Sequence, residues 1–267
     1  MPNPFISVIN SFLSEPQASL LNGILFGTKV NMPNSFYRAL TTTGTLHVIA
    51  LSGINISIII NLIAKITLFM GRKLSCLLTI VLIVSFVVFV GASPSIVRAA
   101  IMGSMSLLAV FFGRRDWGLL SLFLSGGIML LFDLSLMKNI SFQLSFLATF
   151  GIILANRKGE RQQDKSSLRQ IIHWFKENLK LTLVAQLFTL PVILYNFRRI
   201  SLIAPMANIA TEWVIQPIMV LGFVTAISGY LWWPLGLIPS WVVWVPLTYF
   251  ITITEWLAEI PGASINF

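Results

Sequence analysis

The amino-acid sequence predicts an all-α, polytopic helical membrane protein with about eight transmembrane helices and one short re-entrant or interfacial segment. Of its 267 residues, 56% are hydrophobic and only 10% are charged, whereas soluble domains contain about 25% charged residues. The apolar residues form long continuous runs without the alternation of a barrel strand. Because lipid offers no hydrogen-bonding partners, the backbone of each run must satisfy itself within a helix.

Eight apolar runs are long enough, or nearly long enough, to cross a bilayer, whose hydrocarbon core of about 30 Å needs about 17–25 helical residues. Two of them, 117–132 and 141–155, reach only about 22–24 Å as helices, so we expect half-helices buried among their neighbours. The run 200–211 contains Pro205 and Asn208 and is too short to cross, which predicts the re-entrant or interfacial segment. The eight runs are 46–70, 74–91, 94–112, 117–132, 141–155, 181–197, 213–231 and 235–254.

The chain divides into a lead-in and a membrane domain. Residues 1–45 predict an extramembrane N-terminal lead-in, with a short amphipathic helix after Pro16 that Gly27 ends. Residues 46–267 form the membrane domain. Within it, 156–180 predict a basic cytoplasmic loop whose apolar residues recur at helical spacing. Such an amphipathic helix either lies on anionic headgroups or docks a cytoplasmic motor.

The basic residues favour one orientation in the membrane. If the spans alternate in direction, eleven Lys and Arg residues fall in the loops of one side and five in those of the other. Loops rich in Lys and Arg stay in the cytoplasm. We therefore expect a multi-pass protein of the bacterial cytoplasmic membrane with both termini outside. The formal charge of +9 follows from this topology or from contact with nucleic acid.

Several classes of function are excluded by the sequence. Cys76 is the single cysteine, and the two histidines, His47 and His173, lie far apart. No disulfide framework, HExxH site or His-Cys-Cys zinc site can be assembled from them. No GxxxxGK[ST] phosphate loop occurs. We therefore expect no metal and no cofactor, and we assign any ATP-driven step to a partner.

The first span carries a cluster of polar residues. On one continuous helix, His47, Ser52 and Asn55 would fall within an arc of about 140°. Polar side chains at membrane depth are costly and face a bundle interior or a water-filled path. Three interpretations are open: hydrogen bonding between helices, the lining of a pore, and a nucleophile–base pair of His47 and Ser52. That pair lacks an acid to orient the imidazole.

The third span begins with Ser95 and Arg98 after Pro94, a residue suited to the start of a helix. Arg98 lies about 6 Å along the helix axis. Its guanidinium could reach the outer headgroups, or it could lie at the mouth of a vestibule and contact phosphate there. A second face, with Ala99 and Gly103, is made of small residues that allow close helix packing.

Four motifs in order along the chain resemble those of the competence-protein ComEC family. The segment 47–55, HVIALSGIN, is similar to the family's HLLAxSGLH signature, and 93–102, SPSIVRAAIM, to its SPSxxRAxxM element. The segment 142–146 reads FQLSF, as in the family. LPVILYNF at 190–197, followed by PMAN at 205–208, resembles its LPxxxxxF and SPxxN stretch. With weaker similarity upstream, the resemblance runs from about residue 13 to the C-terminus.

The resemblance implies a channel that imports single-stranded DNA across the cytoplasmic membrane during natural transformation, with no catalysis of its own. The implied partners are single-stranded DNA, the lipid bilayer, a separately supplied motor ATPase or helicase, and a second copy if the protein is a homodimer. Asn55 departs from the family, which has a histidine there. No HxHxDH string of the family's metallo-β-lactamase-like domain occurs. By position, the DNA pathway or its structural frame comprises His47, Ser52, Gly53, Asn55, Ser95, Arg98, Gln143, Ser145 and Asn208.

Two other functions stand as alternatives. A small-molecule membrane transporter would predict inverted internal repeats, and the two halves of the sequence show none. An intramembrane enzyme would use His47 and Ser52 as base and nucleophile.

Overall fold

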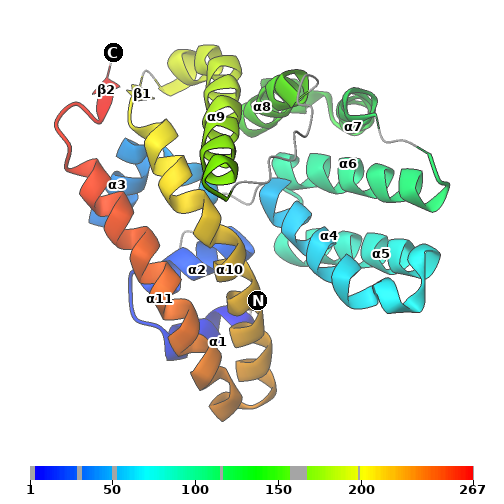
Figure 1. The fold of residues 1–267 in the computed structure, drawn as a ribbon, viewed down its shortest axis with the longest axis horizontal. Coiled ribbons are helices and arrows are strands. Elements are labelled where there is room, and N and C mark those ends of the chain that lie inside the picture. The colour runs from blue at the N-terminus through cyan, green and yellow to red at the C-terminus, as the bar shows by residue number, and fades with distance from the viewer. Residues whose placement is uncertain are drawn as a thin grey trace. The chain divides into compact units, whose positions relative to one another are not determined.

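The structure is a computed structural model that describes residues 4–28, 32–49, 53–114, 117–156, 167–197 and 199–266. Helices make up most of these residues, and the strands described are two of three residues each (Figure 1). The prediction of an all-α protein is confirmed. The chain divides into two compact units, which are described separately: a terminal unit, Met1–Leu51 with Arg199–Phe267, and a central unit, Ser52–Arg198.

The central unit is a helical bundle in which neighbours along the chain also pack together. Its described α-helices are α4 (Gly53–Thr67), α5 (Arg72–Val90), α6 (Pro94–Phe111), α7 (Gly118–Phe132), α8 (Ile140–Asn156) and α9 (Ser167–Phe197), with short 3-10 segments η2 (Leu68–Met70) and η3 (Leu134–Lys138). α4, α5 and α6 pack against one another, α6 also contacts α7 and α8, and α8 contacts α7 and α9. α6 therefore contacts four other α-helices of this unit.

Small residues allow α4 and α6 to approach closely, as the sequence predicts. A Cβ atom at Gly103 of α6 would lie only 2.6 Å from Cδ1 of Ile60 and 3.7 Å from Cγ2 of Ile56, both on α4. A Cβ atom at Gly53, where α4 begins, would lie 3.5 Å from the Cβ of Ala99 on α6. Dispersion contacts at such short range are a main source of helix association in lipid.

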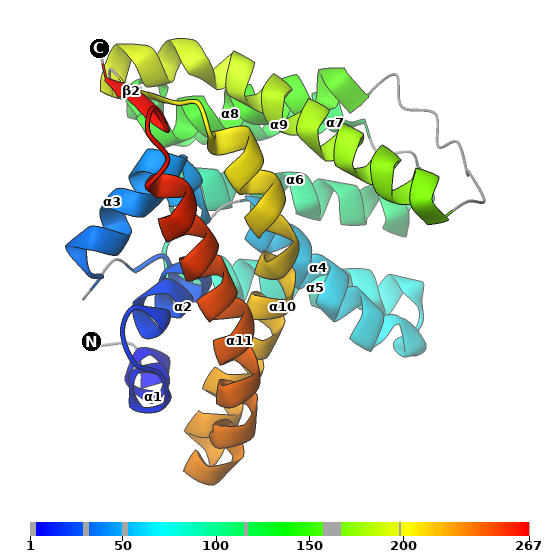
Figure 2. The ribbon, with the colours of Figure 1, turned by 60° about the vertical axis from the view of Figure 1, so that its left-hand side comes forward.

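The terminal unit is built around two long helices. Its described elements are α1 (Pro4–Phe12), α2 (Gln17–Phe26), α3 (Asn34–Thr43), the 3-10 segment η1 (Thr45–Val48), α10 (Ala204–Leu231) and α11 (Trp233–Ala258), with β1 (Arg199–Ser201) and β2 (Ser264–Asn266). α10 and α11 lie side by side (Figure 2). α1 and α2 pack against both, and α3 packs against α11. β1 and β2 pair antiparallel.

α2 ends where the sequence predicts, but its surroundings differ from the prediction. Gly27 adopts a left-handed conformation with φ 69°, and its N–H donates to the carbonyl of Gly23, as expected of a helix C-cap. The predicted short helix is present, but every residue from Ala18 to Phe26 is buried, so it does not behave as an amphipathic helix. The reason is that α1, α10 and α11 all pack against α2.

Six helical segments among the described residues are long and apolar enough to cross a membrane, and the chain is a multi-pass membrane protein. They are Gly53–Met70, Arg72–Val90, Pro94–Phe111, Lys176–Phe197, Ala204–Leu231 and Trp233–Ala258. α7 and α8, at 15 and 17 residues, are short, which confirms the predicted lengths. α7 is not enclosed, however, since Leu131 and Phe132 are 87% and 89% exposed.

Three helix boundaries differ from the sequence prediction. The run 46–70 is divided, because η1 precedes Ile49 and α4 begins only at Gly53. The run 200–211 contains β1 and the first turns of α10, which continues through Pro217 to Leu231 and leaves no separate re-entrant helix. The amphipathic helix predicted in 156–180 starts at Ser167 and is continuous with the following span in α9. Residues 157–166 lie outside the described part of the chain.

The α4–α6 contact generates a prediction. Gly103→Val would insert a branched side chain where Ile60 lies, and overpacking of this kind typically destabilises a protein by about 1–3 kcal/mol. Thermal unfolding of the purified chain in detergent should show a lower Tm. Gly127→Val is the matched control, because α7 offers open space around Gly127 and the cost of valine in a helix is the same. Equal shifts in the two variants would contradict the role of the contact.

Candidate functional site

The central unit buries an arginine inside its helical bundle. Arg98 lies in the second turn of α6 and is only 5% exposed. Its Nη1 donates to Thr149 Oγ1 on α8 and lies 3.9 Å from the sulfur of Met102. Its Nε is buried without a hydrogen-bond partner among the described residues. The guanidinium is therefore incompletely satisfied within the part of the chain that the structure describes.

The start of α4 lies beside the same guanidinium. A Cβ atom at Gly53 would lie 3.9 Å from Arg98 Nη2, so glycine leaves the backbone close to the charge. The first turn of a helix carries partial positive charge on its free N–H groups. A buried guanidinium and a helix N-terminus together make this part of the bundle electropositive. Guanidinium groups bind phosphate through paired hydrogen bonds, so an anion is the complementary ligand.

This burial decides between the two environments that the sequence left open for Arg98. The guanidinium reaches Thr149 on the neighbouring helix, so the alternative in which it extends to the outer headgroups is wrong. A side chain that extends to the interface keeps its charged head in water, whereas the head of Arg98 is held by Thr149 inside the bundle. The site is enclosed in this structure rather than open at a mouth, since Arg98 is nearly fully buried.

Thr149 is a site residue that the sequence analysis missed. Its hydroxyl accepts from Arg98 and donates to the carbonyl of Ser145, four residues earlier on α8, at 2.9 Å. Ser145, a predicted residue, thereby contributes a backbone carbonyl to the same hydrogen-bonded chain. A hydroxyl residue inside an apolar span was the available signal, because such residues form hydrogen bonds between membrane helices.

Three other predicted residues of the central unit lie on α4, α6 and α8. Asn55, the third residue of α4, is 2% exposed. Ser95 Oγ lies 3.3 Å from Ser93 Oγ at the start of α6. Gln143 Nε2 donates to the carbonyl of Met137 at 2.6 Å, which fixes the junction of η3 and α8. Whether Gln143 also lines a path stays a prediction.

The remaining predicted residues lie elsewhere. His47 belongs to η1 in the terminal unit, where its Nδ1 lies 3.0 Å from the carbonyl of Gly44. The predicted common arc with Asn55 is wrong, because the two residues are on separate helical elements. Asn208 lies on α10, and its Oδ1 is buried without a partner among the described residues. Ser52 lies outside the described residues, so the predicted pairing of His47 with Ser52 stays a prediction.

Comparisons with known proteins found one matching family model and two relatives. A family model described as "Competence protein" matches residues 24–267. "ComE operon protein 3" of Bacillus subtilis (strain 168) is 29% identical over 205 residues, which are 76% of this chain and 25% of that protein. An "Uncharacterized protein" of Aquifex aeolicus (strain VF5) is 30% identical over 132 residues, 49% of this chain and 31% of that protein. The chain thus spans a quarter to a third of the length of these relatives. No solved structure matches the chain.

The hydrogen bond between α6 and α8 can be tested by an isosteric substitution. Thr149→Val removes the oxygen that accepts from Arg98 and leaves a buried charged donor unsatisfied, which should destabilise the chain by about 1–3 kcal/mol. Thr149→Ser keeps the hydroxyl and should restore most of the loss. Unfolding of the purified variants in detergent measures both.

Thr189→Val on α9 is the matched control. Thr189 is also buried, and its hydroxyl donates only to carbonyls of its own helix, those of Ala185 and Gln186. The Thr189→Val variant should therefore lose less stability than the Thr149→Val variant. A loss of the same size in both variants would show that the bond to Arg98 contributes nothing of its own.

Proposed function

The chain belongs to the competence protein family, and from this membership we propose that it forms a path by which single-stranded DNA crosses the bacterial cytoplasmic membrane during natural transformation. The family match covers most of the chain, and six helical segments can span a membrane. The proposed task is conduction of a polyanion. It requires no covalent chemistry from the channel itself.

The observation that carries the proposal is the buried guanidinium of Arg98. A charged side chain within a membrane-spanning helix is costly unless it is paired or hydrogen-bonded. One hydrogen bond to a charged group returns about 1.5–3 kcal/mol, and Thr149 supplies one such bond. The buried Nε still lacks a partner among the described residues. An anionic ligand would complete the hydrogen bonding, and the phosphate of a nucleic-acid strand is such a ligand.

This arrangement suits transport that is independent of DNA sequence. Contacts to phosphate position a strand but carry no information about its bases. The positive charge near Arg98 comes from a guanidinium and from the start of α4, neither of which recognises a base edge. Proteins that handle single strands without sequence preference combine such cationic surfaces with aromatic stacking. Imported DNA of any sequence would therefore be accepted.

The proposal also assigns parts to other molecules. The sequence holds no phosphate-binding loop for ATP, so a separate motor ATPase or helicase on the cytoplasmic side would pull the strand. The predicted orientation places the basic residues of 156–180 on that side. A homodimer stays a second option for how the path is completed. Among the predicted residues, Gly53, Asn55, Ser95 and Ser145 would frame the site at Arg98.

Transport by the reconstituted chain tests the proposal. The full chain in liposomes should make fluorescent single-stranded DNA resistant to an added nuclease when a potential or an internal trap draws it inward. Arg98→Gln keeps hydrogen-bonding groups but removes the charge, and it should reduce the protected DNA by about tenfold or more, the effect of losing one hydrogen bond to a charged group. Raising the salt concentration should also weaken entry.

Lys65→Gln is the control variant, because Lys65 is an exposed cation of α4 in the same unit and should leave entry unchanged. Protection that is equal in wild type and Arg98→Gln would contradict a role for the guanidinium. Entry of free nucleotides or inorganic phosphate without entry of DNA would instead support the small-molecule transporter. Both outcomes are informative only for protein that unfolds cooperatively in detergent, which the thermal measurement checks beforehand.

A further inference from the structure

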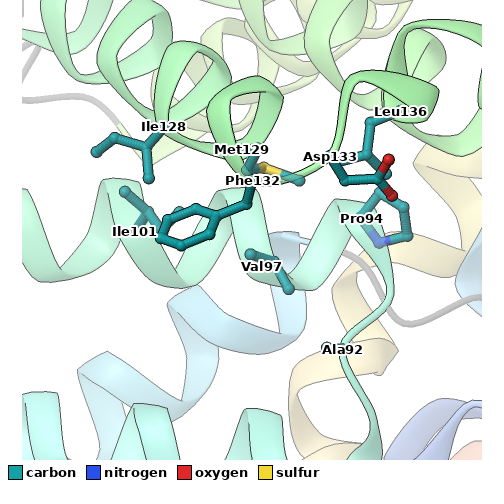
Figure 3. Close-up of a pocket in the computed structure, with 9 residues that line it drawn as sticks. All are labelled: Ala92, Pro94, Val97, Ile101, Ile128, Met129, Phe132, Asp133 and Leu136. Atoms are coloured by element: carbon teal, nitrogen blue, oxygen red, sulfur yellow. The ribbon is translucent and has the colours of Figure 1, made fainter.

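A cavity of about 370 Å³ lies in the central unit, and Arg98 is not among the residues that line it. It is formed by the start of α6, the end of α7 and the connection η3 (Figure 3). Its size falls in the range of about 300–1,000 Å³ that small-molecule sites occupy. Its lining side chains are hydrocarbon apart from the thioether of Met129 and one carboxylate, that of Asp133.

The walls of the cavity belong to helices that face lipid. Ile101 and Ile128 line one end, and Phe132 lies between α6 and α7 (Figure 3). Phe132 is 89% exposed and its neighbour Leu131 is 87% exposed. In a multi-pass membrane protein such apolar surface contacts acyl chains. The cavity is therefore open to hydrocarbon, and an acyl chain is the group that would enter it without loss of hydrogen bonds.

The opposite end of the cavity is polar. Figure 3 shows Asp133 beside Pro94 there. Asp133 is the exposed C-cap residue of α7, and its Oδ1 accepts from the backbone N–H of Ser135 at 2.9 Å. Hydrogen bonds from the Ser135 side chain and backbone lower the pKa of Asp133, so the carboxylate is negative at neutral pH. The C-terminal end of α7 adds partial negative charge at the same place.

A positive helix end lies next to this negative one. Pro94 is the first residue of α6, and the N-terminus of a helix favours an anionic group such as phosphate. Pro94 and Asp133 both line the cavity. At one end of the cavity, the start of α6 attracts an anion and the Asp133 carboxylate beside it attracts a cation. The other end of the cavity accepts hydrocarbon.

We propose that this cavity binds one aminophospholipid of the phosphatidylethanolamine class. Its acyl chain would lie between α6 and α7 along Val97, Ile101 and Phe132. Its primary ammonium would donate to the Asp133 carboxylate, and its phosphate would face the start of α6. A choline headgroup carries the same charges but no N–H donor, so hydrogen bonding to Asp133 discriminates the two. The site does not depend on the proposed import of DNA.

Lipid retention measured by native mass spectrometry tests this assignment. The full chain, purified in detergent with equal amounts of phosphatidylethanolamine, phosphatidylcholine and phosphatidylglycerol of identical acyl chains, should retain one phosphatidylethanolamine preferentially. Asp133→Asn should reduce the preference over phosphatidylcholine by about tenfold, the effect of losing one hydrogen bond to a charged group. Glu259→Gln, at the exposed C-cap of α11 in the terminal unit, should leave the preference unchanged.

A second pair of variants separates the headgroup from the acyl chain. Val97→Phe fills the cavity from α6 and should lower retention of all three lipids, and Ala92→Leu does the same from a position outside any helix, where folding is less at risk. Equal retention of the three lipids by the wild type, or an unchanged preference in Asp133→Asn, would overturn the proposal. Preference for phosphatidylglycerol would overturn it too, because it would show that cations rather than Asp133 select the headgroup.

Discussion

The hydrocarbon core of a bilayer supplies no hydrogen bonds, and the described structure follows from this constraint. Each spanning segment is a helix whose backbone is satisfied internally. Hydroxyl side chains within the spans also need hydrogen-bond partners, and they donate to the carbonyl four residues earlier on their own helix. Examples are Thr79, Thr189, Thr211 and Thr225. A guanidinium has too many donors for this solution. Arg98 must therefore find partners on other helices or on a ligand.

This distinction explains how the central unit is assembled. The contact between α4 and α6 is made by small residues and dispersion, since Gly103 accepts Ile60 against its backbone. The contact between α6 and α8 includes a polar bond from Arg98 to Thr149. α6 thus packs on α4 largely through small residues and on α8 partly through a charge. The two contacts meet at the start of α4, where Gly53 lies close to both Ala99 and the guanidinium.

The lengths of the apolar runs and the positions of glycine and proline predict the helices well. They predict poorly which helices pack against one another. The apolar runs place helices at all the expected spans, and Gly27 ends α2 as predicted. Pro205 led to the wrong prediction of a separate re-entrant segment. It lies in the first turn of α10, where a proline removes no backbone hydrogen bond. Burial of α2 on all sides depends on α10 and α11, nearly 200 residues away. Arg98 was recognisable as an ionisable group at membrane depth, whereas Thr149 becomes its partner only through the packing of α6 on α8.

The length of α9 has a mechanical consequence. Its 31 residues, with Pro191 among them, measure about 46 Å along the helix, more than the thickness of a hydrocarbon core, about 30 Å. The turns before Lys176, where the candidate span starts, account for the excess length. Lys180 ties α9 to the carbonyl of Ala155 at the end of α8, and α8 carries the hydroxyl that holds Arg98. Through this bond and its packing on α8, α9 supports the helix that supplies the hydroxyl to the buried charge.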